Sequence, residues 1–267
     1  MSIKLALSTL GCPDMSLDEI AALALENGVS GIELMGGEYG LISPELSHER
    51  KLEVKNIIDQ NGLVIPDITT YAMFVSPDKK VRRENSELLA RYCELAALVG
   101  APYVRSFIGT PESGNEDDVC LYAAEALSEA AELSAGTGAY IIIETHDWIA
   151  MDSKRLVKIL GNCPDSIGVL WDFEIPESFG EPLPYTFSLF DKKIRHVHVK
   201  DMLAGAEKSV HCAVGEGGLP IAEAVNLLKS IGFDGFCSYE WERMWIRDLA
   251  PIQEMLPKFA NYMRTLM

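Results

Sequence analysis

The chain has 267 residues, of which 48% are hydrophobic, and its formal net charge is −17. Its basic residues form only short pairs such as Lys79-Lys80, so the composition argues against nucleic acid and anionic membranes as partners. Met1–Ser8 turns polar too early for a signal peptide, and no apolar stretch is long enough to span a membrane. Six cysteines without disulfide-like spacing indicate reduced thiols in a cytoplasmic protein.

Short β-branched or aromatic runs alternate with helix-like runs along the whole chain. In chain order, we predict the strand Ile3–Ser8, a helix capped by Ser16, the strand Gly31–Met35, a helix around Pro44–Asn61, the strand Leu63–Thr69, the helix Val81–Val99, the strand Tyr103–Ile108, the helix Asn115–Ser134, the strand Tyr140–Thr145, the helix Ser153–Leu160, the strand Gly168–Asp172, a weak helix around Tyr185–Phe190, the strand Ile194–Val199, the helix Ile221–Ile231, the strand Gly235–Glu240 and a last helix from Ala250 to Leu266.

Eight β/α units without a hairpin signal favour a closed (β/α)8 barrel over an open doubly wound sheet. An open sheet would place a glycine-rich phosphate loop after its first strand, and the loop Ser8–Asp14 matches no such motif. Gly215-Glu216-Gly217-Gly218 is instead typical of a turn that needs a positive φ. No linker interrupts the pattern, so we expect residues 1–267 to form a single barrel domain.

Four successive strands end in a residue that can ligate a metal: Glu144, Asp172, His198 and Glu240. Because the carboxyl ends of parallel strands meet at one end of a barrel, we expect these side chains to converge. One strand-end acid such as Asp172 is equally well explained as a helix N-cap, but the set of four favours a single metal site. One imidazole and three carboxylates suit Mn²⁺, Mg²⁺ or Co²⁺, with Zn²⁺ as an alternative.

Several short motifs lie at the strand ends and in the loops: Gly11-Cys12-Pro13, Gly31-Ile32-Glu33-Leu34, Val104-Arg105-Ser106-Phe107, Glu144-Thr145-His146, His196-Val197-His198-Val199-Lys200-Asp201, Gly215-Glu216-Gly217 and Tyr239-Glu240-Trp241. With these motifs the chain resembles the xylose isomerase-like TIM barrel superfamily, which includes sugar phosphate isomerases and epimerases, inosose dehydratases and endonuclease IV. The resemblance covers essentially the whole chain. In ketose 3-epimerases of this group a Glu, Asp, His, Glu set binds one divalent cation, which implies the same role for Glu144, Asp172, His198 and Glu240.

This ligand set predicts a divalent-metal-dependent isomerase or epimerase acting on a keto-sugar or sugar phosphate. A metal that chelates the substrate's hydroxyl and carbonyl would stabilise the enediolate formed when the neighbouring carbon loses its proton. Glu144 and Glu240 approach from opposite sides of the mouth and are the candidate catalytic acid and base. The same geometry would serve a metal-dependent lyase or dehydratase of a keto-inositol or keto-sugar. A non-catalytic metal- and sugar-binding relative is a third alternative, although it has no need of two opposed bases.

Two positions depart from the ketose 3-epimerase pattern. Ile175 stands where those enzymes carry a His three residues after the metal Asp, and Asp147-Trp148-Ile149-Ala150 replaces a stretch with a further Glu. These departures disfavour 3-epimerisation of a simple ketose. Endonuclease IV fits poorly, because it needs a trinuclear zinc site built from many histidines and this chain has five. The resemblance is compatible with a homo-oligomer.

Four further residues are candidates for contact with the substrate. Glu33, at the end of the second strand, either hydrogen-bonds substrate or is a structural acid. Arg105 lies in an apolar run, where it needs an interior acid such as Glu33 or Glu144, or else reaches an anionic substrate. His146 follows Glu144 by two residues and either touches substrate, supports the site or is a plain loop residue. Lys200 either polarises a carbonyl, contacts a phosphate or pairs with an acid.

Other polar and aromatic residues near the strand ends have simpler interpretations. His196 alternates with His198, so both point into the barrel, and we expect His196 to be a core histidine one layer below. Trp148, Trp241 and Trp245 either stack on a sugar or pack in the core or a lid. The family motif makes His211 and Glu216 candidate site residues, against a default of solvated loop positions.

Overall fold

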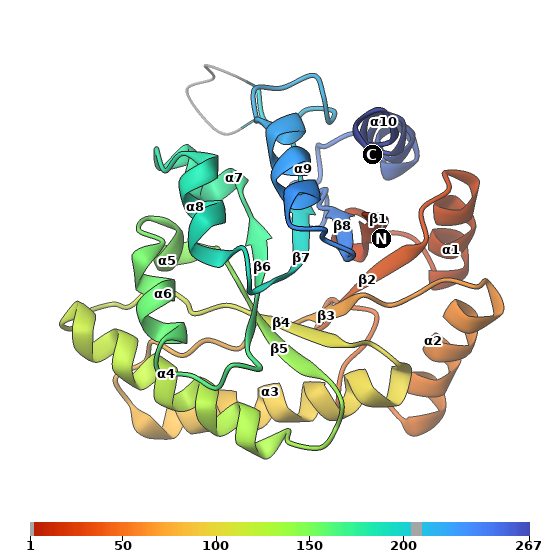
Figure 1. Ribbon diagram of the computed structural model, residues 1–267. Coiled ribbons are helices and arrows are strands. Elements are labelled where there is room, and N and C mark those ends of the chain that lie inside the picture. Colours follow the sequence, from red (N-terminus) through yellow and green to blue (C-terminus); the bar gives the residue numbers. More distant parts are fainter. Residues whose placement is uncertain (1–2, 204–209) are drawn as a thin grey trace.

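Eight parallel strands close into a barrel in which each strand pairs with the next and the last pairs with the first (Figure 1). The computed structural model describes residues 3–203 and 210–267. The strands are β1 (Lys4–Ser8), β2 (Gly31–Met35), β3 (Asp67–Thr69), β4 (Tyr103–Ser106), β5 (Tyr140–Glu144), β6 (Gly168–Asp172), β7 (Ile194–Val199) and β8 (Phe236–Tyr239). The predicted (β/α)8 barrel is therefore confirmed.

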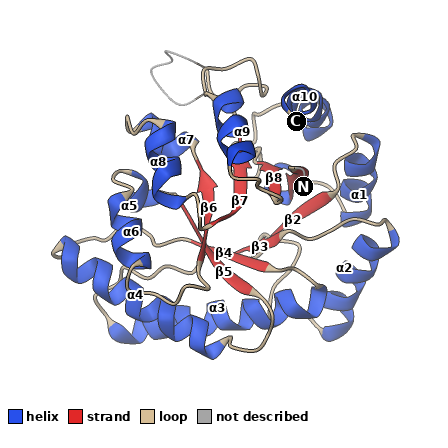
Figure 2. Cartoon of the chain, viewed as in Figure 1, coloured by secondary structure: helices blue, strands red, loops and turns tan. Residues whose placement is uncertain are grey.

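The helices lie around the strands and cover the outer face of the barrel (Figure 2). They are α1 (Leu17–Glu26), α2 (His48–Gln60), α3 (Lys79–Val99), α4 (Glu116–Leu133), α5 (Asp147–Ala150), α6 (Lys154–Leu160), α7 (Glu174–Ser178), α8 (Leu183–Phe190), α9 (Ile221–Ser230) and α10 (Ile252–Leu266), with a 3₁₀ turn η1 (Thr9–Gly11) after β1. The strands between them are buried on both faces, as every residue of β2 and β6 shows. This burial explains their continuous apolar sequence.

Local capping chemistry sets the ends of the helices as the sequence indicated. Ser16 and Glu19 form a reciprocal capping box at the start of α1. Gly100 ends α3 with a φ of 84°, which a residue with a side chain rarely adopts. Gly215 has a φ of 91°, which confirms the predicted turn after β7.

Two groups of elements differ from the sequence prediction. The third strand spans Asp67–Thr69 rather than Leu63–Thr69, because Pro66 has no N–H to donate to a neighbouring strand; Val64 makes an isolated bridge with Gly31. The short segments η1, α5 and α7 at the strand ends were not predicted. Helices of one turn are too short to show the periodicity on which sequence prediction relies.

The six cysteines are free, and four of them are buried, as expected for packing residues. Within residues 3–203 and 210–267, no helix combines the length and the apolar character that crossing a membrane requires.

Candidate metal and substrate site

The four predicted ligand residues meet at the carboxyl end of the barrel. Glu144 and Asp172 are the last residues of β5 and β6, His198 is next to last in β7, and Glu240 follows β8 directly. The strand register places Asp172 opposite His198, and His198 opposite Ser238. One ligand atom from each of the four residues lies within 4.8 Å of the others, and all four side chains are buried. Four residues that are far apart in the sequence thus form a compact set of one imidazole and three carboxylates.

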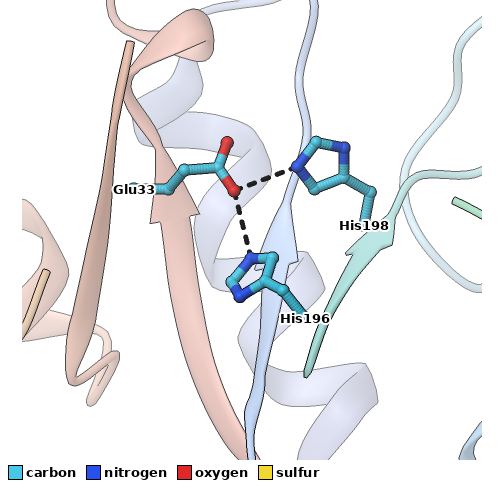
Figure 3. Close-up of side chains that lie close together, drawn as sticks. All are labelled: Glu33, His196 and His198. Atoms are coloured by element: carbon cyan, nitrogen blue, oxygen red, sulfur yellow. Dashed lines mark hydrogen bonds and ion pairs between the residues drawn. The ribbon is translucent and has the colours of Figure 1, made fainter. Parts of the chain in front are cut away.

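The two ring nitrogens of His198 face different groups. Nε2 lies 3.0 Å from Oε2 of Glu33 (Figure 3). Nδ1 lies 3.3 Å from Oε1 of Glu144 and 3.1 Å from Oε1 of Glu240. Among the described residues these Nδ1 contacts lack hydrogen-bond geometry, so Nδ1 is buried without a hydrogen-bond partner. A hydrogen bond from Nε2–H to Glu33 leaves a lone pair on Nδ1 directed at the two carboxylates, which is the arrangement a metal-ligating histidine needs.

A second polar layer lies beneath His198, inside the barrel. Nε2 of His196 is 3.1 Å from the same Glu33 oxygen (Figure 3). It also lies 2.8 Å from Oγ of Ser238. Asp67 is fully buried, and neither of its carboxyl oxygens has a hydrogen-bond partner in the described part of the chain. Burial, and then the charge of Glu33, hold the pKa of Asp67 well above its usual range. His196 is confirmed as a buried core histidine.

The sequence prediction that Glu33 lies at the end of the second strand is wrong. Glu33 is the middle residue of β2 rather than the last, and its side chain is 1% exposed. Its contacts are the two histidines. Substrate contact by Glu33 stays a prediction, while the structure gives it the position expected of a structural acid. Together with His196 and His198 it forms a second group of ligand-type atoms, in which the short N–O distances are those of hydrogen bonds.

Arg105 is buried in β4 and forms an ion pair inside the barrel. Its Nε lies 3.0 Å from Oε2 of Glu144, which is one of the two partners named from the sequence. Its Nη1 donates a hydrogen bond of 2.9 Å to the carbonyl oxygen of Thr70. Arg105 therefore fixes the orientation of a candidate metal ligand.

Lys200 likewise forms ion pairs with acidic side chains. Its Nζ lies 2.7 Å from Oδ2 of Asp172 and 2.7 Å from Oε2 of Glu240, and its side chain is almost fully buried. Of the alternatives raised by the sequence, pairing with an acid is what the structure shows. A buried ammonium group held by two carboxylates keeps both in place.

Negative charge exceeds positive charge at this end of the barrel. In the described residues, two permanent cations contact four buried carboxylates. The cations are Arg105 and Lys200, and the carboxylates are Glu144, Asp172, Glu174 and Glu240. Two further positive charges would balance the set, which is the charge of one divalent ion.

Burial and the excess of negative charge also shift the pKa values of Asp172 and His198. Burial raises the pKa of the Asp172 carboxyl to about 7; Lys200 opposes this shift and Glu240 adds to it. Burial opposes protonation of His198, yet the charges of Glu240, Glu33 and Glu144 raise its pKa well above the ordinary value. Protons on these groups reduce the excess negative charge, so a bound cation has to displace them.

The mouth of the barrel carries His146 beside an aromatic ring. The His146 ring packs against Phe107 at a tilt of 46°, with 4.7 Å between ring centroids, and its Nδ1 lies 2.9 Å from Oδ1 of Asp147. Asp147 has a φ of 54°, a left-handed conformation that is uncommon outside glycine and frequent at functional sites. Contact between His146 and substrate stays a prediction. The residue lies just after β5 at the mouth of the barrel, on the same side as the candidate ligands.

The three tryptophans have different environments. Trp148 packs against the core, with the Arg155 guanidinium 4.5 Å from its ring. Trp241 is buried and donates a hydrogen bond of 2.9 Å to the carbonyl oxygen of Ala250. Trp245 is 52% exposed, so it alone of the three presents a large free surface.

His211 and Glu216, the two loop residues predicted from the family motif, lie in different places. Nε2 of His211 lies 3.6 Å from Oε2 of Glu242, at the edge of the site. Glu216 instead forms an exposed ion pair with Lys258, away from the ligand set.

Several residues near the site were not identified from the sequence. Glu174 and Glu242 lie 3.8 Å and 3.5 Å from Nζ of Lys200. Each follows a candidate ligand by two residues, and this spacing in the sequence could have identified both as residues near the site. Asp201 accepts hydrogen bonds from four backbone amides of the loop after β7, whereas in the sequence it is identified only as part of a family motif.

Comparison with known proteins shows the family. Fructoselysine 3-epimerase of Escherichia coli O157:H7 is 23% identical over 260 residues, which are 92% of this chain and 93% of that protein. The crystal structure of the probable 3-DHS dehydratase AsbF from Bacillus anthracis has a TM-score of 0.80 at 19% identity and covers 98% of this chain and 99% of its own. The structure of the IolI protein with a bound zinc atom has a TM-score of 0.82 at 17% identity, covering 99% and 98%. The family model for the xylose isomerase-like TIM barrel matches residues 21–264, and the chain belongs to that family.

Proposed function

We propose that this protein is a divalent-metal-dependent isomerase or epimerase that moves a proton at a carbon beside the carbonyl of a keto-sugar. The observation that carries the proposal is the convergence of Glu144, Asp172, His198 and Glu240 within 4.8 Å at the mouth of the barrel. The relation to a sugar epimerase supports it. In (β/α)8 enzymes the active site lies at this end.

The residues present fit a divalent cation. Nδ1 of His198 is buried between two carboxylates and, among the described residues, has no hydrogen-bond partner. The ligand set contains oxygen and nitrogen donors and no thiolate, which suits Mn²⁺, Mg²⁺ or Co²⁺ and admits Zn²⁺. When bound, such an ion supplies Lewis-acid stabilisation of the negative charge that develops on the substrate oxygens.

Glu144 and Glu240 are the groups proposed to carry the proton. They extend from β5 and from the end of β8, and both lie near Nδ1 of His198. Arg105 holds the Glu144 carboxylate and Lys200 holds that of Glu240, so each has a fixed direction. One carboxylate removes the proton from one face of the substrate carbon, and the other acid returns a proton to the second face or to the neighbouring atom.

Exchange in deuterated water tests the reaction. Mn²⁺-loaded protein incubated with ketoses and keto-inositols should place deuterium on the carbon next to the carbonyl, detected by NMR. Glu144→Gln and Glu240→Gln should each slow exchange by ~10²–10⁴-fold, the usual contribution of one positioned acid or base. Metal content is measured in both variants, since loss of the ion would also abolish exchange.

Other outcomes separate the alternatives. Exchange accompanied by release of water and a deoxy-keto product would identify a lyase, a reaction class that the dehydratase among the structural neighbours makes a specific alternative. A metal-loaded protein that binds a ketose without any exchange would overturn the isomerase proposal and indicate a binding protein.

A further inference from the structure

Three aromatic side chains form an exposed row on the loops at the mouth of the barrel. Tyr39 follows β2, Tyr71 follows β3 and Trp245 follows β8, and we call these three residues the aromatic rim. Trp245 lies 6.2 Å from Tyr39 and 6.3 Å from Tyr71, measured between ring centroids. Their exposed fractions are 65%, 39% and 52% in chain order. Contiguous exposed aromatic surface at the mouth of a barrel is typical of a binding surface.

The aromatic rim continues into the candidate metal site. Tyr71 lies 6.0 Å from Phe107, and both rings lie against the Arg105 guanidinium, at 5.8 Å and 4.1 Å. Arg105 in turn forms the ion pair with Glu144. A substrate whose keto group meets Glu144 would therefore extend over Tyr71 toward Trp245. The row is longer than one aromatic ring, so it offers stacking surface for more than the reacting part of the sugar.

The charges between the aromatic rim and the candidate metal site disfavour an anionic substituent there. Arg105 and Lys200 are each paired to carboxylates of the candidate ligand set. Lys200 also has Glu174 and Glu242 within 3.8 Å and 3.5 Å. A phosphate dianion would have to displace one of these pairs and would face unpaired negative charge. A neutral group incurs neither cost, and its C–H faces can stack on exposed rings.

We propose that the aromatic rim is a substrate subsite for an uncharged sugar ring attached to the reacting ketose. The substrate class is then an unphosphorylated ketose that carries a second sugar, rather than a sugar phosphate. This inference rests on the proposed function for the position of the keto group, and it adds which substituent the site accepts. It also fits the departures at Ile175 and at 147–150 from the pattern of enzymes that act on simple ketoses.

Three commercial ketoses test the subsite by calorimetric binding to the Mn²⁺-loaded protein. They are D-fructose, isomaltulose and D-fructose 6-phosphate. The last two carry their substituent on the same oxygen of the same ketose, a neutral glucose in one and a phosphate in the other. We expect isomaltulose to bind at least about fivefold more tightly than fructose, as one added aromatic stacking contact allows. Fructose 6-phosphate should bind more weakly than isomaltulose.

Two variants separate the subsite from general effects on the protein. Trp245→Ala should bring the affinity for isomaltulose close to that for fructose and leave fructose binding unchanged. Tyr140→Ala is the matched control, because Tyr140 is 51% exposed but begins β5 at the opposite end of the barrel. It should leave both affinities unchanged.

The outcomes for subsite and reaction are distinguishable. Tighter binding of fructose 6-phosphate than of isomaltulose, an unchanged isomaltulose affinity in Trp245→Ala, or no binding of isomaltulose would each overturn the subsite, whatever the exchange experiment shows. Preference for isomaltulose without deuterium exchange on any ketose would overturn the proposed reaction and leave the subsite supported.

Discussion

At the scale of single residues, the site depends on how His198 is held. A histidine can ligate a metal only through a ring nitrogen that carries no proton, and the partner of the other nitrogen decides which one that is. Glu33 lies 3.0 Å from Nε2 and leaves Nδ1 facing Glu144 and Glu240. Glu33 thus acts on the proposed metal site through His198, without being one of its four ligands.

Replacing Glu33 tests this positioning role. Glu33→Gln removes the carboxylate that accepts from Nε2, so we expect Mn²⁺ affinity to fall by about 10–100-fold, the usual effect of changing a ligand's hydrogen-bond partner. Calorimetric titration with Mn²⁺ measures it, and circular dichroism of the metal-free variant checks folding. Glu53→Gln, on the exposed face of α2, is the control. An unchanged Mn²⁺ affinity in a folded Glu33→Gln protein would rule the role out.

The sequence identified the residues at the strand ends better than those beneath them. Glu144, Asp172 and His198 could be selected because each is a polar residue that ends a buried apolar run. The contact of Glu33 with two histidines 163 and 165 positions away depends on barrel closure, which no local pattern contains. Asp67 lies in a short strand whose register only the neighbouring strands define.

At the scale of elements, one carboxylate organises the loop that follows β7. Oδ1 of Asp201 accepts from the backbone amides of Met202 and Leu219, at 3.0 Å and 3.2 Å. Oδ2 accepts from those of Gly215 and Gly217, at 2.9 Å and 3.0 Å. Gly217 is required at this place, because a Cβ would lie 2.2 Å from Oδ1 of Asp201.

The substitution Asp201→Asn should destabilise the fold. Both oxygens accept two amides, so the asparagine –NH₂ group leaves two backbone N–H groups without an acceptor in either orientation. Loss of these bonds should lower the free energy of unfolding by about 2–4 kcal/mol. Urea denaturation measures the change, and Asp18→Asn on the exposed surface of α1 should stay within about 0.5 kcal/mol of the parent protein. Equal stability of Asp201→Asn and the parent would show that the loop does not depend on this carboxylate.

Element prediction succeeded where local chemistry was strong and failed where tertiary contacts decide. The capping box at Ser16 and the glycine that ends α3 mark helix ends in the sequence itself. The third strand was overestimated because Leu63–Ile65 is apolar, yet only Asp67–Thr69 pairs continuously with β4. The short helices α5 and α7 lie directly after candidate ligands, and their few residues carry no periodic signal.

At the scale of the whole molecule, closure of the barrel concentrates part of a large negative charge at one end. The chain has a net charge of −17, and four carboxylates are buried around two cations at the mouth. Burying such a set is costly without a balancing charge. The divalent cation that we propose at Glu144, Asp172, His198 and Glu240 would supply this balance.

The number of ions bound per chain is the decisive measurement for the proposed metal site. We expect calorimetric titration with Mn²⁺, checked by elemental analysis, to give one ion per chain in the parent protein. His198→Ala and Asp172→Ala should bind no ion at that site, and His48→Ala, which changes an exposed histidine, should bind one. Parent-level metal content in both His198→Ala and Asp172→Ala would show that no ion binds at these four residues.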